Sequence, residues 1–292
     1  MPEIIKVKSL HFYPIKSCRG IELRQMQIGP MGPEHDRRYM VVNGKDVFVA
    51  QRGDNTQGTI GVRSMCMIVP RFGVSGFVLS APGMPDLPLP FSGLPGPERQ
   101  VQIWRQIVPA VDQGNEAAEW FTEYLSRTVP GTYRLVHMPD PGTRRTEIDD
   151  VGVAFADGFP LLITSQASLD ALNETRDPGT APIPMDRFRT NIVIEGCDPF
   201  FEDELLRRRF TIGDVTFTGV KPCVRCPITT INQVTGECGK FPLNMLAKHH
   251  EKFHGPLLKE LDPDAPKGAI FGMNVNHDGT GTISRGDTLI VQ

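Results

Sequence analysis

Short apolar runs separated by glycine- and proline-rich turns constrain this chain more than any other feature of its sequence. The turns include Tyr13-Pro14, the segment Gly29–Pro33, and Asn43-Gly44. The 292 residues contain 29 glycines and 26 prolines, close to a fifth of the chain against a usual share of about 12%. No collagen-like period or low-complexity segment accounts for the excess, so it must lie in turns between short strands. The sequence therefore predicts a mostly β (α+β) protein.

The same patterns predict an order of elements. Strands are expected within 4–28 and in a hairpin that joins 38–42 to 47–50 through Asn43-Gly44. Residues 81–98, rich in proline and glycine, are expected to form an exposed loop. Further strands are expected at 191–195, 210–212, 215–220 and 228–231, and in a last hairpin that turns at 279–281 and ends with 288–291. Helices are expected at 116–127, at 166–176 after a Ser165 N-cap, and over part of 243–261.

The chain is long enough for about two domains. Proline, glycine and charged residues cluster at 139–150 and suggest a boundary there. We therefore expect an N-terminal part over 1–125 and a larger part over 130–292. Because candidate site residues occur in both parts, we expect the functional site to lie between them.

Charge and hydropathy exclude several functional classes. The net charge of −3 gives no polyanion-binding surface, and Arg207–Arg209 is expected to be a solvated strand entry, so we expect no nucleic-acid partner. No apolar stretch approaches the roughly 18 residues of a membrane span, and the first residues lack a signal-peptide pattern. We therefore expect a cytoplasmic protein with no membrane span, in which the six cysteines are mostly reduced.

Cys223 and Cys226 form the most distinctive pair of cysteines. Lys221 and Arg225 lie beside them, and cationic neighbours favour the thiolate, the form that attacks substrates or binds soft metals. Four interpretations remain open at this point: a zinc site, a thioredoxin-like redox pair, a single thiolate ligand to a metal cofactor, and two structural cysteines.

Two of these interpretations make further demands on the sequence. The nearest additional zinc ligands are Cys238, His250 and His254, at a longer spacing than zinc fingers use. A redox pair would need a helix directly after the motif, whereas Pro227 and the β-branched residues at 228–231 predict a strand.

Three other segments carry groups that suit an anionic ligand. Lys16 and Ser17 lie at the end of an expected strand, where an ammonium and a hydroxyl can both reach a phosphate oxygen. The forked guanidinium of Arg37 can bind a phosphate in the same way. Arg189 and Asn191 are two residues apart in an expected strand, so they project to the same side. Each segment alone is more typical of a solvated surface.

The order of these motifs along the chain resembles the MOSC family, and in particular the mitochondrial amidoxime-reducing components and their bacterial counterparts. The segments that carry the resemblance are Tyr13–Gly20, Asp36–Val42, Gln51-Arg52, Phe155–Leu169, Arg187–Val193, Ile212–Val215, Lys221–Cys226 and Val275–Ile290. The resemblance covers nearly the whole chain and implies an N-terminal β-barrel domain followed by a barrel-like MOSC domain with peripheral helices. This chain has Arg189-Thr190-Asn191 where the family usually shows Arg-Pro-Asn.

The resemblance also implies a molybdenum cofactor, which is a pterin dithiolene with a phosphate tail. Cys226 matches the metal ligand of the family, while the role of Cys223 stays open. Lys16, Ser17 and Arg37 match the positions that hold the phosphate. The positions that line the rest of the cofactor pocket correspond to Asp157, Ser165, Arg189, Asn191 and Arg225.

By the same resemblance, the protein is expected to be an oxidoreductase that reduces N-hydroxylated compounds (amidoximes, hydroxylamines and N-hydroxylated bases) to amines or amidines. Cys226 and Asp157 are the expected catalytic residues, with Asp157 as a proton-handling group. The sequence lacks the cysteine-rich iron–sulfur extension of some bacterial members, so a separate flavin, haem or iron–sulfur protein is expected to supply electrons. The alternatives are a molybdenum-cofactor carrier and a persulfide-based sulfur transferase.

Overall fold

The computed structural model describes residues 4–54, 58–140, 142–176, 179–253, 255–262, 264 and 268–292, and the side chains of these residues except those at 249–253 and 255–257. Strands predominate, which confirms the expected mostly β fold. Within the described residues, no helix has the length and apolar character that crossing a membrane would require.

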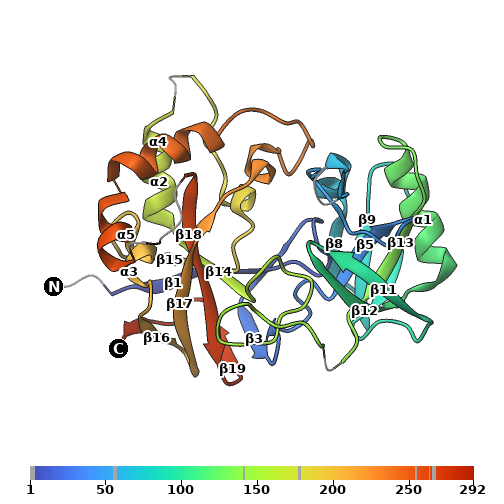
Figure 1. The fold of residues 1–292 in the computed structure, drawn as a ribbon, viewed down its shortest axis with the longest axis horizontal. Coiled ribbons are helices and arrows are strands. Elements are labelled where there is room, and N and C mark those ends of the chain that lie inside the picture. Colours follow the sequence, from blue (N-terminus) through green and yellow to red (C-terminus); the bar gives the residue numbers. More distant parts are fainter. Residues whose placement is uncertain are drawn as a thin grey trace.

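Strands from both ends of the chain share the largest sheet (Figure 1). In sheet order they are β2 (Ile21–Leu23), β1 (Lys6–Phe12), β15 (Ile192–Glu195), β14 (Leu161–Ser165), β18 (Ile270–Asp278), β17 (Val215–Val224), β16 (Arg209–Ile212) and β20 (Leu289–Val291). β14 and β15 run parallel, whereas β1 and β15 run antiparallel. β3 (Gln25–Gly29) likewise lies between β4 (Gly32–Pro33) and β19 (Gly281–Ser284). The first strands of the chain therefore pair with the C-terminal half, and the division into domains 1–125 and 130–292 stays a proposal.

The remaining strands build a second, smaller group of sheets. A four-stranded sheet has the order β11 (Glu98–Ile103), β12 (Gln106–Asp112), β13 (Tyr133–His137) and β5 (Tyr39–Asn43). A three-stranded sheet has the order β10 (Leu87–Pro90), β9 (Gly76–Ser80) and β8 (Val69–Phe72), and β6 (Val49–Ala50) pairs with β7 (Ile60–Gly61). In Figure 1 this group lies on the right, with α1 (Gly114–Ser126) along its outer side.

α1 matches the helix expected at 116–127. Its apolar face buries Ala117, Trp120, Phe121 and Leu125, which are spaced as one side of an α-helix requires. One hydrophobic core then runs through both groups of sheets, from Trp120 and Phe121 of α1 to Phe217 in the large sheet. This shared core holds the two groups of sheets in one arrangement.

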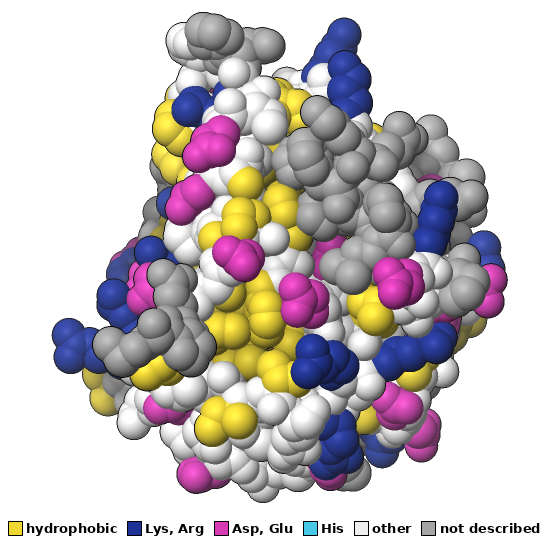
Figure 2. Space-filling view, turned by 90° about the vertical axis from the view of Figure 1, so that its left-hand side faces the viewer, with side chains coloured by type: hydrophobic (Ala, Val, Ile, Leu, Met, Phe, Trp, Pro, Cys, Tyr) yellow, Lys and Arg dark blue, Asp and Glu magenta, His cyan; other side chains and the backbone are white. Residues whose placement is uncertain are grey.

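Four helices surround the large sheet on the left of Figure 1: α2 (Gln166–Glu174), α3 (Phe201–Glu204), α4 (Leu243–Phe253) and α5 (Gly255–Leu261). α2 begins after Ser165, as expected, because the Ser165 hydroxyl accepts a hydrogen bond from the Ser168 N–H. Figure 2 shows this side of the molecule, where hydrophobic side chains gather near the centre with acidic and basic side chains around them.

Three expectations about local structure were wrong. Residues 227–230 form a 3-10 helix rather than the strand expected at 228–231. Pro227 has the backbone angle of a first helical position, and the Thr229 and Thr230 hydroxyls donate to the carbonyls of Cys226 and Pro227. The expected loop 81–98 contains strand β10, and the last strands do not form a hairpin with each other, because β19 pairs with β3 and β20 with β16.

Candidate functional site

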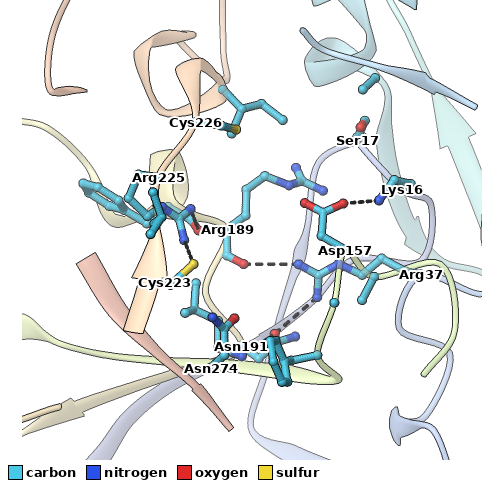
Figure 3. Close-up of a pocket in the computed structure, with 18 of the residues that line it drawn as sticks. Lys16, Ser17, Arg37, Asp157, Arg189, Asn191, Cys223, Arg225, Cys226 and Asn274 are labelled. Carbon is cyan, nitrogen blue, oxygen red and sulfur yellow. Dashed lines mark hydrogen bonds and ion pairs between the residues drawn. The ribbon is translucent and has the colours of Figure 1, made fainter. Parts of the chain in front are cut away.

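A pocket lies where the two groups of sheets meet (Figure 3). It brings together nearly all the site residues expected from the sequence: Lys16, Ser17, Arg37, Asp157, Arg189, Asn191, Arg225 and Cys226. Other lining residues that bear on its chemistry are Phe48, Arg52, Trp104, Phe188, Cys223 and Asn274. The structure thus assembles one site from segments at opposite ends of the chain.

Unusual backbone conformations aim three of the polar residues. The backbone φ angles are +69° at Ser17, +47° at Arg37 and +54° at Arg189. These values lie in the left-handed region, which residues other than glycine rarely adopt. Such conformations persist only where the surrounding structure enforces them, and they concentrate at functional sites. Arg189 lies at the end of the 3-10 helix Met185–Phe188, just before β15, and not within the strand expected there.

Tyr13 holds two of the cations in place. The guanidinium carbons of Arg37 and Arg189 lie 4.2 and 4.3 Å from the centre of its ring. Asp36, whose side chain is 2% exposed, accepts hydrogen bonds from Arg37 Nη1 at 2.6 Å and from the Tyr13 N–H at 2.8 Å. Burial raises the pKa of the Tyr13 hydroxyl to about 12, so the ring stays neutral between the two cations. Both guanidinium groups are therefore fixed before any ligand binds.

Asn191 joins this arrangement to the large sheet. Its side-chain oxygen accepts hydrogen bonds from Arg37 Nη1 and from the Leu162 N–H, both at 3.2 Å. Its amide nitrogen donates to the His11 carbonyl at 3.1 Å. Thr190, where the resemblance to the family leads us to expect proline, is buried, and its hydroxyl donates to the carbonyls of Leu162 in β14 and Ile192 in β15. The substitution therefore leaves Asn191 in the pocket.

Lys16 and Asp157 form an ion pair beside Arg37, across the pocket from Cys223 (Figure 3). Lys16 Nζ also donates to the Phe155 carbonyl at 2.9 Å, and Trp104 Nε1 donates to the Asp157 carboxylate at 3.1 Å. Desolvation lowers the pKa of Lys16, while Asp157 opposes that change. The Asp157 side chain is largely open to solvent, yet the surrounding pocket desolvates it in part, which acts to raise its pKa. The charge and hydrogen bond of Lys16 outweigh this and bring the pKa below its ordinary value. The carboxylate is therefore ionised in this arrangement.

The two thiols have different surroundings. Cys223 lies at the end of β17, and its sulfur is 2.9 Å from Arg225 Nη1 (Figure 3). Arg225 Nη2 donates to the Phe188 carbonyl at 2.6 Å. The sequence placed Arg225 beside both cysteines, and the structure shows that it contacts Cys223, because residues two apart near the end of a strand project to the same side. Among the described residues, no hydrogen bond reaches the Cys226 sulfur, which is partly exposed in the pocket.

Ser165 was expected in the pocket, and the structure places it elsewhere. It is fully buried, and its hydroxyl caps α2 and lies 2.6 Å from the Ser168 hydroxyl. Ser168 in turn donates to the buried carboxylate of Glu202 at 2.8 Å. The Ser165 hydroxyl is thus engaged in holding α2 to β14 and α3.

The structure bears on the competing interpretations of the cysteine pair. Within the described residues, no group of three or more metal-binding side chains lies together. The side chain of His250 and the whole of His254, named as possible zinc ligands, lie outside the described residues. Cys238 is exposed on the surface, 3.2 Å from the Thr230 hydroxyl. The segment after Cys226 is a single 3-10 turn and not the long helix of a thioredoxin-like site.

Sequence reasoning missed Trp104, Arg52 and Asn274. Trp104 occupies the turn between β11 and β12, at a φ of +52° that is unusual for so large a residue. Its ring packs edge-to-face on Phe48 at 4.7 Å, with the Arg52 guanidinium 5.4 Å away. A tryptophan between two strands at a turn was a usable signal, because this position favours small or flexible residues.

Comparisons with known proteins identify the family of the chain. The model of the MOSC N-terminal beta barrel domain matches residues 4–128, and that of the MOSC domain matches residues 150–290. The mitochondrial amidoxime reducing component 2 of Homo sapiens is 31% identical, over 98% of this chain and 83% of its own length. The chain belongs to the MOSC family.

This MOSC protein is also similar to other members of the family. The mitochondrial amidoxime-reducing component 1 of Xenopus laevis is 28% identical, over 96% of this chain and 80% of its own length. The molybdenum cofactor sulfurase 1 of Aedes aegypti is 28% identical over 83% of this chain, which corresponds to 32% of that much longer protein.

Proposed function

We propose that this MOSC protein binds the molybdenum cofactor in the pocket of Figure 3 and reduces N-hydroxylated compounds. One observation supports the proposal most: two thiols and several cationic side chains from distant segments line a single pocket. The relatives named for amidoxime reduction, which match almost the whole chain, support the choice of reaction.

The residues present fit this cofactor. Cys226 would be the metal ligand, since a soft thiolate suits a metal that also binds dithiolene sulfurs. Lys16, Ser17 and Arg37 would hold the phosphate, through charge-assisted hydrogen bonds. Arg189, Asn191 and Arg225 would line the rest of the cofactor. We leave Ser165 out of this set because its hydroxyl caps α2.

The charge of the pocket supports the same assignment. Among the described lining residues, Asp157 is the one acidic side chain, against Lys16, Arg37, Arg52, Arg189 and Arg225. Cations that are fixed in advance bind an anionic ligand without reorganising, which strengthens binding. Arg37 and Arg189 meet this condition through their stacking on Tyr13.

The net reaction consumes two electrons and two protons, breaks the N–O bond, and yields the N–H compound and water. When bound, the cofactor supplies the two-electron chemistry. The protein contributes a pocket walled by Phe48 and Trp104, which restricts the approach of substrate, and the exposed carboxylate of Asp157, which we propose passes protons between solvent and the pocket. A separate flavin, haem or iron–sulfur protein is proposed as the electron donor.

The test is turnover of benzamidoxime by molybdenum-loaded protein with an artificial reductant. We expect benzamidine to form with loaded protein, and none to form with protein purified from a host that cannot make the cofactor. Loaded protein that turns over no N-hydroxylated substrate would favour a cofactor carrier. A persulfide on Cys223 or Cys226 under the same conditions would favour sulfur transfer, a function suggested by the relative named molybdenum cofactor sulfurase 1.

A further inference from the structure

The ion pair between Lys16 and Asp157 is unequal in burial. The Lys16 side chain is 7% exposed, whereas the Asp157 side chain is 71% exposed. A buried ammonium without a counter-ion is strongly unfavourable, while an exposed carboxylate can return to water at little cost. Lys16 therefore requires an anion at this position, but nothing requires that the anion be Asp157.

The surroundings of Lys16 leave room for one anion. Its ammonium has three donors. One donates to the Phe155 carbonyl and one to Asp157. The rings of Phe48 and Trp104 lie 5.4 and 5.8 Å from the ammonium. The third donor lies on the side of these two rings, and the Lys16 side chain is almost fully buried, so we infer that an incoming phosphate oxygen takes the position of the carboxylate.

Arg144 confines such an exchange to the side chain of Asp157. This buried guanidinium donates to the carbonyls of Ala154, Ala156 and Asp157, the last at 2.5 Å. It also donates to the Gln106 side chain at 2.6 Å, next to the turn that carries Trp104. The backbone that carries Asp157 is thus fixed, and the carboxylate can leave Lys16 only by rotation of its side chain, which breaks the hydrogen bonds from Lys16 and Trp104.

We propose that Asp157 is an internal counter-ion of Lys16 that a phosphate group displaces on binding, with loss of the hydrogen bond from Trp104 to Asp157. This inference rests on the proposed function, because it takes Lys16 as a phosphate-binding residue. The exchange also explains why an acidic side chain, Asp157, lies in a pocket whose other charged side chains suit an anion. The carboxylate satisfies Lys16 while the pocket is empty and becomes available for proton transfer once the phosphate is bound.

The test follows the Trp104 indole in cofactor-free protein during titration with inorganic phosphate. The chain has two tryptophans, so ¹⁵N-tryptophan labelling gives two indole N–H signals in NMR spectra. Trp120 lies in α1 with its N–H bonded to the Pro85 carbonyl, and Trp120→Phe assigns the two signals. We expect phosphate to shift the Trp104 signal saturably, and sodium chloride at equal ionic strength to leave it unchanged.

Two variants and a matched control make the test decisive. Asp157→Asn removes the competing charge and should bind phosphate about two- to fivefold more tightly, the range of an exposed ion pair. Lys16→Met should abolish the response, and Asp140→Asn, an exposed carboxylate paired with Arg38, should match the wild type. Phosphate binding that depends on Lys16 but is no tighter in Asp157→Asn, or that leaves the Trp104 signal unmoved, overturns the inference.

These outcomes separate the inference from the proposed function. Tighter phosphate binding by Asp157→Asn, together with a loaded protein that turns over no N-hydroxylated substrate, would refute the reductase and support the counter-ion. Turnover of an N-hydroxylated substrate by the loaded wild-type protein, together with unchanged phosphate affinity in Asp157→Asn, would support the reductase and refute the counter-ion. No phosphate binding in any variant would contradict the counter-ion exchange and the phosphate assignment of Lys16 together.

Discussion

The Arg225 guanidinium lies 2.9 Å from the sulfur of Cys223, two residues earlier in the chain, and not on the neighbouring Cys226. The Cys223 and Cys226 thiols, three residues apart, therefore differ in their hydrogen bonds. Cys223 has a cationic hydrogen-bond donor, whereas Cys226 faces the pocket with no hydrogen bond to its sulfur from the described residues. This arrangement leaves the Cys226 sulfur available to a ligand, and we propose that Cys223 supports the site by holding Arg225.

We therefore predict different outcomes for the two cysteine variants. Cys226→Ser should abolish reduction of benzamidoxime, since a hydroxyl is a poor replacement for a soft thiolate ligand. Cys223→Ser should keep a substantial fraction of the activity, because the serine hydroxyl still accepts a hydrogen bond from Arg225. Steady-state turnover of the two purified variants, each loaded with cofactor, measures this difference. The opposite pattern would assign the ligand to Cys223.

The other four cysteines serve as matched controls. Burial raises the pKa of the Cys18 and Cys66 thiols, and raises that of Cys197 to about 11, so these thiols are protonated at neutral pH. Cys238 lies on the surface outside the pocket of Figure 3. Each Cys→Ser change should leave metal content unchanged, with Cys238→Ser the variant least able to disturb the fold.

A second prediction concerns Asp36, which has no place in the expected site but holds Arg37. Asp36→Asn removes the buried partner of a guanidinium and should lower the free energy of unfolding by about 3 kcal/mol. It should also weaken phosphate binding, because Arg37 loses its fixed position. Urea denaturation measures the first effect, with Asp140→Asn as an exposed control that should change stability by less than about 0.5 kcal/mol. Equal stability of both variants would show that Asp36 has no positioning role.

A third prediction uses pH and concerns Glu202, which is buried beside Ser168 and Asp203. Burial, and next the charge of Asp203, raise the pKa of its carboxyl from 4.5 to about 7. Because the folded-state pKa is the higher one, the protonated carboxyl stabilises the fold fully below about pH 4.5, and this contribution is lost as pH rises through 7. It amounts to about 3 kcal/mol at its largest.

Glu202→Gln should therefore flatten the decline of unfolding free energy between pH 5 and 7.5, as measured by urea denaturation at several pH values. Glu204→Gln, an exposed change in the same helix, provides the matched control and should retain the decline. A wild-type stability that is constant or rises across this range contradicts the assignment.

The sequence predicted the residues that line the pocket better than it predicted the elements that carry them. Lys16, Arg37, Asn191 and Cys226 were all predicted, because their motifs occur in a family order that depends on the site and not on local structure. The 3-10 helix at 227–230 was not predicted, because the β-branched residues there indicate a strand. Pro227 and the hydrogen bonds from the threonine hydroxyls to backbone carbonyls favour the 3-10 helix instead.

Residues that act through tertiary contacts were the hardest to predict. Ser165 was recognised both as a helix cap and as a pocket residue, and only the structure shows that its hydroxyl is committed to α2. Arg144 and Trp104 come from separate segments and both donate hydrogen bonds to Asp157, and no local sequence pattern predicts contacts of this kind. Asp36 lies next to Arg37 in the sequence, but its burial and its hydrogen bond from the Tyr13 N–H could not be read from the sequence.

The most direct measurement of the central claim is elemental analysis of the wild-type protein and its two cysteine variants, purified from a host that makes the molybdenum cofactor. We predict molybdenum near one atom per chain in the wild type, a substantial fraction of that in Cys223→Ser, and little in Cys226→Ser. Zinc in place of molybdenum in the wild type, with equal metal loss in both variants, would contradict the account.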